Sequence, residues 1–388
     1  MVPSLVIRYR PFLNRLFLLL IVFAAPTLLR AQIAVPTTGG GLSIAVNPAT
    51  NKIYVPSRGA LHTVNVIDSA TNTTKTVTAG TNPTTAAVNP VTNKIYVTDT
   101  TDNTVTVIDG ASDSVTATVP VGSTPLNVAV NTLTNKVYVA NLDSNSVTVI
   151  DGATNNVTAT VPTTANRPYA IAVNPVTNKV YVANAVTGAG NVTVIDGATN
   201  TPTSATVSGA PQSVAVNPVT NQFYVTSPGT VTVFDGTTNM AIANPTAGAA
   251  PAMVVVNPVT NRAYVLNFAD SPNNTVTVID GANNYATSTL PMGGTFPYTL
   301  AVNPVTNKIY VGNFTFTGGS NPTDASVTVI DGATNATTTV PAVGTGSSVL
   351  IVAANPVTNR VYTSVPGTVS VIDGAINTPI STSPRGWA

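Results

Sequence analysis

The chain has 388 residues, of which 43% are hydrophobic and only 7% are charged, and it contains no cysteine. The lack of cysteine excludes disulfides and thiolate metal sites, so stability has to come from a packed core, which a chain of this length can form. All fourteen acidic residues are Asp, which favours turns, and none is Glu, which favours helices. Outside the N-terminal segment eleven Lys and Arg stand against these fourteen Asp, so we expect no nucleic-acid partner.

The first segment has the features of an export signal. Three arginines precede an apolar run over 16–25, and a small residue, Ala31, follows a few positions later. This order is typical of a secretory signal peptide, and the run is shorter than the roughly 20 residues of a membrane-spanning helix. We therefore predict a signal peptide over 1–31 and a mature domain over 32–388 without a membrane span. The predicted location is secreted, periplasmic or at the cell surface. An uncleaved membrane anchor is the alternative.

The rest of the chain is built from eight repeated units. Each unit opens with a phrase of the form AVNPVTNKIYV and continues with one of the form TVTVIDGATN. The first Asn of the opening phrase recurs every 40 to 52 residues, which is the range of four-stranded propeller blades. These asparagines are Asn47, Asn89, Asn131, Asn174, Asn217, Asn257, Asn303 and Asn355. The aspartates of the second phrase are Asp68, Asp109, Asp151, Asp196, Asp235, Asp280, Asp331 and Asp373.

Within a unit the sequence predicts four short strands. In the third unit they read PLNVAV, KVYVA, SVTVID and VTATVP, and Asn, Pro, Gly or Asp bounds each β-branched run. The turn between strands one and two is usually NPVTN, in which Pro presets φ and the second Asn takes a left-handed conformation. Helical repeats would need a 3.6-residue apolar period that is not present, and β-solenoid turns are usually shorter. We predict an all-β fold, a β-propeller of four-stranded antiparallel blades, with eight blades and seven as the alternative.

The two ends of the repeat region predict how the ring closes. Residues 33–36 resemble a fourth strand with no preceding strands of their own, and residues 378–381 form a degenerate fourth strand that contains Pro379. Because Pro cannot donate a backbone hydrogen bond, it makes a poor strand. We therefore predict that 33–36 completes the last blade and removes an exposed edge.

These motifs carry a family resemblance. The N-P-x-T-N-K/R-x-Y-V and V-I-D-G phrases over residues 40–377 resemble those of the YVTN-family β-propeller repeat proteins, which include surface-layer and other exported proteins. The literal tetrad is absent; the copies read YVTD, YVAN, YVTS, YVLN, YVGN, YVPS and YTSV. The resemblance implies an exported propeller. Many members of this family are expected to have seven blades, and the family has no shared catalytic motif from which an active site could be transferred.

The repeated residues are predicted to be structural. The eight aspartates are expected to form Asx turns. The residue that begins strand two is expected, where charged, to pair with this aspartate ring; the set is Lys52, Lys94, Lys136, Lys179, Gln222, Arg262, Lys308 and Arg360. A tyrosine ring is expected to fill the space between blades, and it consists of Tyr54, Tyr96, Tyr138, Tyr181, Tyr224, Tyr264, Tyr310 and Tyr362.

The propeller topology places ligand contact on one rim. The 1–2 and 3–4 turns are almost uniform and share one rim, whereas the 2–3 and 4–1 loops vary and share the other, where binding residues usually lie. Exposed aromatic and arginine side chains in these loops are the candidate ligand contacts. They are Phe268, Phe296, Tyr298, Phe314, Phe316, Arg58 and Arg167. The alternative is that the aromatic rings bury one another in a small local core.

Other polar loop residues allow weaker hypotheses. Oxygen ligands for Ca²⁺ could come from the 2–3 loops, but their spacing matches no calcium loop, so we interpret them as solvated loop residues and expect no metal site. The set is Asp99, Asp102, Asp143, Asp270, Asp324, Asn103, Asn141 and Asn145. The single histidine, His62, lies in a loop with no serine placed beside it.

The sequence therefore predicts an exported binding or scaffold protein without catalysis or a cofactor. Its expected partner is a protein, peptide or glycan on the varied rim. A self-assembling surface-layer component is one alternative. A propeller enzyme of the lactonase, lyase or quinone-dependent type is the other, because the fold alone specifies no chemistry.

Overall fold

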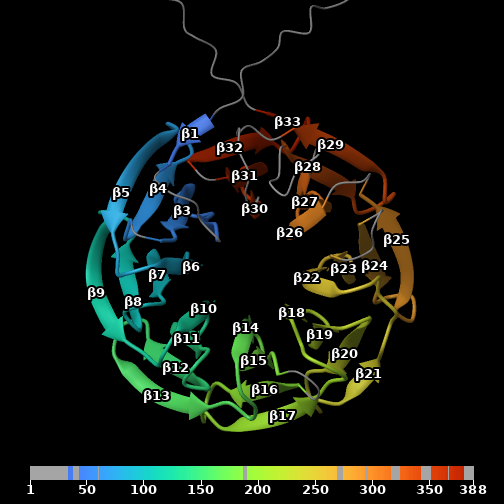
Figure 1. Ribbon diagram of the computed structural model, residues 1–388, viewed down its shortest axis with the longest axis horizontal. Helices are drawn as coiled ribbons and strands as arrows, with labels where there is room; N and C mark the ends of the chain where they lie inside the picture. Colours follow the sequence, from blue (N-terminus) through green and yellow to red (C-terminus); the bar gives the residue numbers. More distant parts are fainter. Residues whose placement is uncertain are drawn as a thin grey trace, which may run out of the picture.

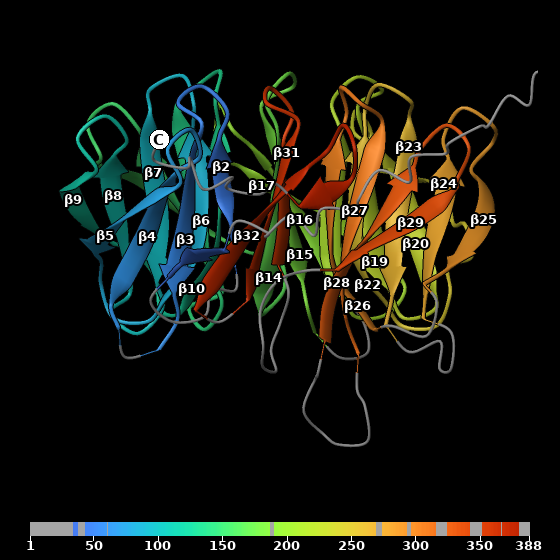
Figure 2. The same cartoon turned by 90° about the horizontal axis from the view of Figure 1, so that it is seen from above.

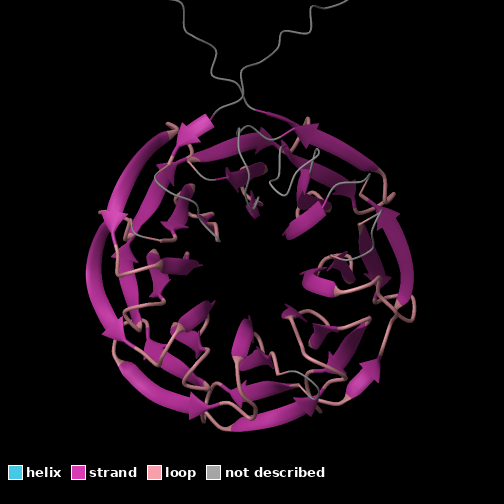
Figure 3. Cartoon of the chain, in the orientation of Figure 1, coloured by secondary structure: helices cyan, strands magenta, loops and turns pink. Residues whose placement is uncertain are grey.

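The computed structural model describes residues 34–37, 43–59, 61–186, 190–268, 274–292, 296–315, 324–341, 351–365 and 367–379. Every regular element in these ranges is a β-strand (Figure 3). The strands form eight antiparallel sheets arranged as a ring around a central axis (Figure 1). The protein is thus a β-propeller with eight blades, as predicted, and the seven-bladed alternative is excluded. Among the described residues, no helix could cross a membrane.

The first four blades each contain four strands. Blade 1 comprises β2 (Ala45–Asn47), β3 (Lys52–Ser57), β4 (Thr63–Asp68) and β5 (Thr73–Thr78). Blade 2 comprises β6 (Pro83–Asn89), β7 (Lys94–Asp99), β8 (Thr104–Asp109) and β9 (Ser114–Pro120). Blade 3 comprises β10 (Pro125–Asn131), β11 (Lys136–Asn141), β12 (Ser146–Asp151) and β13 (Val157–Pro162). Blade 4 comprises β14 (Pro168–Asn174), β15 (Lys179–Asn184), β16 (Asn191–Asp196) and β17 (Pro202–Thr206).

The remaining four blades follow the same order, and the last one includes the first and the last described strand. Blade 5 comprises β18 (Ser213–Asn217), β19 (Gln222–Ser227), β20 (Thr230–Asp235) and β21 (Ala241–Ala243). Blade 6 comprises β22 (Pro251–Asn257), β23 (Arg262–Asn267), β24 (Thr275–Asp280) and β25 (Ala286–Pro291). Blade 7 comprises β26 (Phe296–Asn303), β27 (Lys308–Thr315), β28 (Asp324–Asp331) and β29 (Thr337–Pro341). Blade 8 comprises β30 (Ile351–Asn355), β31 (Arg360–Val365) and β32 (Thr368–Asp373), with β1 (Ala34–Pro36) and β33 (Thr378–Pro379) beside β32.

The first strand of each blade lies innermost and the fourth outermost (Figure 1). The 1–2 and 3–4 turns meet on one face of the ring, since the N–H of Gly110 donates to the carbonyl of Asn93 at 2.8 Å. We call this face the Asn-Pro rim; it forms the upper edge in Figure 2. The opposite face, with the 2–3 and 4–1 loops, is the loop rim. The predicted separation of uniform turns from varied loops is therefore confirmed.

The hydrophobic core lies between blades. In each of eight clusters the tyrosine of one blade packs with strands two and three of the next; Tyr96, for example, packs with Val137 and Val139. The last cluster joins Tyr362 to Ile53 and so links blade 8 to blade 1. All eight tyrosines are at most 1% exposed, which confirms that they fill the space between blades.

A ring of asparagine side chains fastens the Asn-Pro rim. The Nδ2 of Asn89 donates to the Oδ1 of Asn135 in the next blade at 2.8 Å. Equivalent bonds of 2.7–3.0 Å join every pair of neighbouring blades, and the bond from Asn355 to Asn51 closes the circle. The donors are all fully buried. The acceptor asparagines have φ of 52–58°, as predicted for the left-handed end of the turn.

The aspartate ring forms Asx turns, as predicted. Asp109 Oδ1 accepts the N–H groups of Ala111 and Ser112 at 3.1 and 2.8 Å, and the same oxygen accepts a turn N–H in all eight blades. The hydrogen bonds from Ser112 hold the pKa of Asp109 below its ordinary value.

The predicted pairing of the lysine ring with the aspartates is wrong in most blades. Lys94 Nζ instead donates to the carbonyl of Gly152 in the next blade at 2.7 Å. Among the described residues only Arg262 forms an ion pair with a repeated aspartate, Asp280, at 3.3 Å. The reason is geometric: each amine extends across the blade interface, whereas the carboxylate is turned inward to its own Asx turn.

The first and the last described strand both contribute to the outer edge of blade 8. Strand β1 pairs with β32 through Val35 and Val369, which confirms the predicted closure for Ala34–Pro36; Ile33 lies outside the described residues. Strand β33 pairs with the other end of β32, through Thr378 and Asp373. The fourth strand is therefore shared between the two candidates instead of being formed by one of them.

Candidate functional site

A β-bulge turns one side chain of the innermost strand toward the axis of the ring. In blades 3, 4, 6 and 7 the register of strands one and two shifts by one residue just after the opening Pro. A bulge re-aims the extra side chain and ends regular pairing. We call this residue, five before the first Asn of the unit, the bulge position. The six described residues at the bulge position are Thr84, Leu126, Tyr169, Gln212, Ala252 and Tyr298.

These six side chains line one cavity at the axial opening of the loop rim. The cavity has a volume of about 650 Å³ and is lined by residues of all eight blades. That volume lies in the range of small-molecule sites, roughly 300–1,000 Å³. None of its described lining residues is charged; besides the aromatic and aliphatic ones, the wall contains the amides of Asn127 and Gln212 and several hydroxyl groups.

Three of the side chains that line this axial cavity are aromatic. Phe268 and Tyr298 meet edge to face with ring centroids 6.5 Å apart, and both line the cavity together with Tyr169. Phe268 and Tyr169 are 42% and 43% exposed. Burial raises the pKa of Tyr298 above its ordinary value, the phenol of Tyr169 raises it further and the charge of Arg58 lowers it. The phenol of Tyr169 in blade 4 is therefore close enough to act on Tyr298 in blade 7.

A second row of side chains fixes the cavity wall. Asn127 Nδ2 donates to the carbonyl of Tyr169 in the next blade at 2.6 Å. Thr85 Oγ1 donates to the carbonyl of Leu126 at 2.9 Å. Thr85 and Asn127 directly follow the bulge position of blades 2 and 3, and each binds the main chain at the bulge position of the next blade. The backbone that carries Leu126 and Tyr169 is therefore fixed by the neighbouring blade.

The hairpin of blade 7 corrects a predicted loop. Phe314 is predicted to lie in a 2–3 loop, but β27 and β28 extend past it, with Phe314 opposite Ala325. Phe296 pairs with Phe314 across β26 and β27, and their rings stack with centroids 5.7 Å apart. Alternation along the extended hairpin buries Phe314 to 8% exposure. Its ring lies 6.0 Å from that of Tyr298, so it supports the cavity wall from behind.

The remaining candidate contacts are more peripheral. Arg58 and Arg167 are exposed, and neither lines the axial cavity. Arg58 is close enough for its charge to act on Tyr298. Phe316 and Asp270 lie outside the described residues. The structure thus brings together Phe268, Tyr298 and the stacked pair behind them.

The candidate calcium ligands are used within the loops. Asn103 and Asn145 each accept a backbone N–H from a 4–1 connection, at 2.8 Å. Asp102 accepts the N–H of Thr81 at 2.6 Å. Asp99 is fully buried, and burial raises its pKa to about 6 although Thr106, Thr104 and Gly80 donate to it. No group of three or more His, Cys, Asp or Glu that could hold a metal occurs in the described part of the chain.

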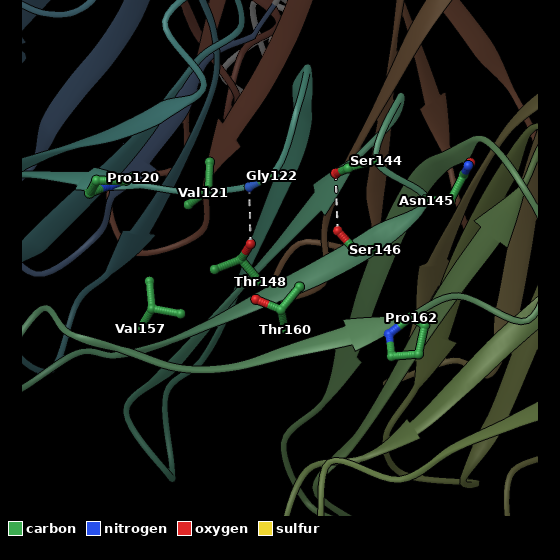
Figure 4. Close-up of a pocket in the computed structure, with 10 residues that line it drawn as sticks. All are labelled: Pro120, Val121, Gly122, Ser144, Asn145, Ser146, Thr148, Val157, Thr160 and Pro162. Carbon is green, nitrogen blue, oxygen red and sulfur yellow. Dashed lines mark hydrogen bonds between the residues drawn. The ribbon is translucent and has the colours of Figure 1, made fainter.

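A second cavity lies at the junction of blades 2 and 3. It has a volume of about 480 Å³ and is lined by ten residues, among them Gly122, Thr148 and Pro162 (Figure 4). The N–H of Gly122 donates to Thr148 Oγ1 at 3.3 Å. Its side chains are small and come from one blade junction only. It offers a ligand fewer distinct groups than the axial cavity does.

Sequence reasoning missed three of the axial residues. Tyr169 and Asn127 lie in strand one and Gln212 directly precedes it, a part of the unit that the repeat predicts to be structural. A signal was present: the residue at the bulge position changes from one described unit to the next, whereas the three residues before the first Asn of each unit are always Ala, Val, Ile or Leu. Reading variation at one position across the eight units would have found it.

The fold and this cavity define the protein as an eight-bladed β-propeller with an aromatic axial opening. Among solved structures, the chain is similar to a chain of Kuenenia stuttgartiensis hydrazine synthase, with a TM-score of 0.59 and 18% identity over 88% of this chain and 98% of that chain. At that identity the likeness shows the propeller fold alone. No protein-family model matches the sequence, and no curated protein matches it.

Proposed function

We propose that this chain is an exported binding module that takes a neutral glycan in the axial cavity of the loop rim. One observation carries the proposal: the bulge positions differ from blade to blade, and their side chains line a single cavity. A ring built only for structure would repeat this position as it repeats the tyrosines.

The chemistry of the wall favours a sugar. Aromatic faces such as those of Tyr298, Tyr169 and Phe268 stack on the apolar face of a pyranose, and amide and hydroxyl groups bind its hydroxyls. The described lining contains no charge that would select an ionic ligand. The N-terminal pattern that is typical of a signal peptide supports export to the periplasm or cell surface. The resemblance to exported YVTN-type propellers agrees with this location.

The test is a glycan and peptide array probed with the purified chain, followed by calorimetry on the best ligand. Tyr298→Ala and Tyr169→Ala should each weaken binding roughly tenfold, the value of a lost aromatic contact of about 1–1.5 kcal/mol. Tyr285→Ala is the matched control, because Tyr285 lies in a 3–4 turn on the Asn-Pro rim and its hydroxyl is bound by Gln222.

The outcomes separate the alternatives. Unchanged affinity in both cavity variants would refute the axial site. Peptides bound in place of sugars would keep the site and refute the ligand class. Chemical turnover of a bound compound would favour the enzyme alternative, and recovery of the exported protein only as sheets would favour a surface-layer component.

A further inference from the structure

The Asn-Pro rim carries a ring of exposed aliphatic side chains. The residue after Pro in the 1–2 turn, or after Thr132 in blade 3, is a Val or Leu in seven of the eight blades. These side chains are 68–75% exposed and include the most exposed large hydrophobic residues in the described part of the chain. They are Val91, Leu133, Val176, Val219, Val259, Val305 and Val357; blade 1 has Ala49. Single exposed aliphatic residues are ordinary, but these residues recur at the same position of seven blades around one rim, which makes the rim a candidate interaction surface.

The ring of tips is rigid. The N–H of each tip residue donates to the side chain of the first Asn of its own turn, at 3.0 Å for Val91 and Val357. That same Asn binds the next blade through the asparagine ring. The tips are therefore fixed in height and spacing before any partner arrives. Such preorganisation lowers the entropic cost of binding.

The repetition identifies the partner. Because strand one is innermost, the tips surround the axis (Figure 1). A surface that presents a ring of the same radius and repeat can cover all seven side chains together. A second copy of this chain has that geometry. We propose that the Asn-Pro rim is an interface between two copies stacked face to face about a twofold axis.

The charges of the rim agree with self-association. The repeated Asp and the Lys or Arg that begins strand two lie farther from the axis than the tips. There are eight of these Asp and seven of these Lys or Arg. Copies related by a twofold axis thus meet with apolar tips against apolar tips and mixed charges against mixed charges. An isologous contact of this kind closes at two copies. This interface does not depend on the glycan site, which lies on the opposite rim.

The test measures the mass of the full chain in solution. Sedimentation should give twice the 39.4 kDa of one chain at micromolar concentration. A triple variant, Val91→Lys, Val219→Lys and Val357→Lys, should give one chain mass with an unchanged circular dichroism spectrum. The matched control places Lys at Val115, Val157 and Ile242, which are exposed residues of the outer strands β9, β13 and β21, and should stay dimeric. All three proteins share the apolar segment over 16–25, so that segment cannot explain a difference.

A second measurement does not depend on the fold of the lysine variant. The chain has no cysteine, so Val219→Cys introduces one thiol at a tip and Val115→Cys one on an outer strand. A bifunctional maleimide should yield covalent dimers with the tip thiol and few with the outer one. A monomeric parent chain, equal cross-linking of the two thiols, or tip-dependent sedimentation with neutral lipid vesicles by a monomer would overturn the proposal.

Discussion

The two rims of the ring use the same strands in opposite ways. On the Asn-Pro rim the first Asn of the unit repeats eight times and in every blade binds an Asn of the neighbouring blade, as Asn89 does with Asn135. On the loop rim the side chains bind mostly within their own loops or the next connection, and the bulge position differs from blade to blade. The difference teaches that one face of a propeller can be held constant by a closed hydrogen-bonded circle, which leaves the other face free to vary.

The largest expected effect is at a buried donor of the asparagine ring. Asn131→Ala removes the bond to Asn178 and the two turn N–H bonds of 3.1 and 3.2 Å, so we expect a loss of roughly 3 kcal/mol in the free energy of unfolding. Asn145→Ala on the loop rim removes one bond to a backbone N–H and should cost about 1 kcal/mol. Urea unfolding measures both. Equal losses would contradict the contrast between the rims.

Two aspartates, Asp99 on the loop rim and Asp109 on the Asn-Pro rim, should make stability depend on pH in opposite ways. Burial raises the pKa of Asp99 to about 6, whereas turn hydrogen bonds lower that of Asp109. Between the ordinary value of 3.8 and about 6 the folded state holds a proton on Asp99 that the unfolded state has lost, so stability falls as pH rises through this window. The contribution of Asp109 to stability has the opposite sign, because its pKa is lowered in the folded state. It is lost only as the pH falls below the ordinary pKa of an aspartate.

The variant Asp99→Asn should therefore gain stability at pH 7, by on the order of 2 kcal/mol. Asn141 occupies the equivalent position in blade 3 and donates to Thr148 at 2.9 Å, so the amide fits such a site. Thermal unfolding at pH 4.5 and pH 7 measures the change. Parallel shifts of parent and variant at both pH values would show that Asp99 does not titrate in this window.

A smaller loss of stability is expected when the ring is opened at the outer edge of blade 8 than when a bond of the asparagine ring is removed. Removing Ala34–Pro36 exposes one end of β32 but leaves the Asn355–Asn51 bond and the blade 8 to blade 1 core in place. We expect a loss of about 1–2 kcal/mol from the unmade backbone bonds. Removal of residues 386–388 is the length-matched control for thermal unfolding. If the two truncated chains melt together, β1 does not close the ring.

The smallest effect is expected at the lysine ring. Lys94→Met removes bonds of 2.7 and 3.1 Å to Gly152 and Asn155 and should cost about 0.5 kcal/mol, as is usual for partly exposed charged contacts. Blade 5 has the neutral Gln222 at this position and still closes. A loss above that of Asn131→Ala would make the lysines, and not the asparagines, the main fastening of this rim.

The sequence predicts the fold well because the same turn residues mark the strand boundaries in every repeated unit. Strand edges, the left-handed Asn of each turn and the Asx role of Asp109 all follow from local chemistry. Pairing between blades does not: Lys94 meets Gly152, 58 residues away, and the repeat alone does not say which group of the next unit an amine will reach. The site was harder for a related reason. Aromatic residues in long loops attract notice, whereas Tyr169 lies inside a repeated strand, and only a comparison of the bulge position across the units distinguishes it from its neighbours.

The shared outer edge of blade 8 makes the start of the chain arbitrary. Strands β1 and β33 lie along the same partner, β32, so a short linker could join the two ends and new termini could be cut between β9 and β10. Such a circular permutant would have a different first blade and the same ring. In the thermodynamics of repeat arrays, such a closed ring is a one-dimensional chain with periodic boundaries. No repeat is terminal in it, so unfolding does not have to begin at an end.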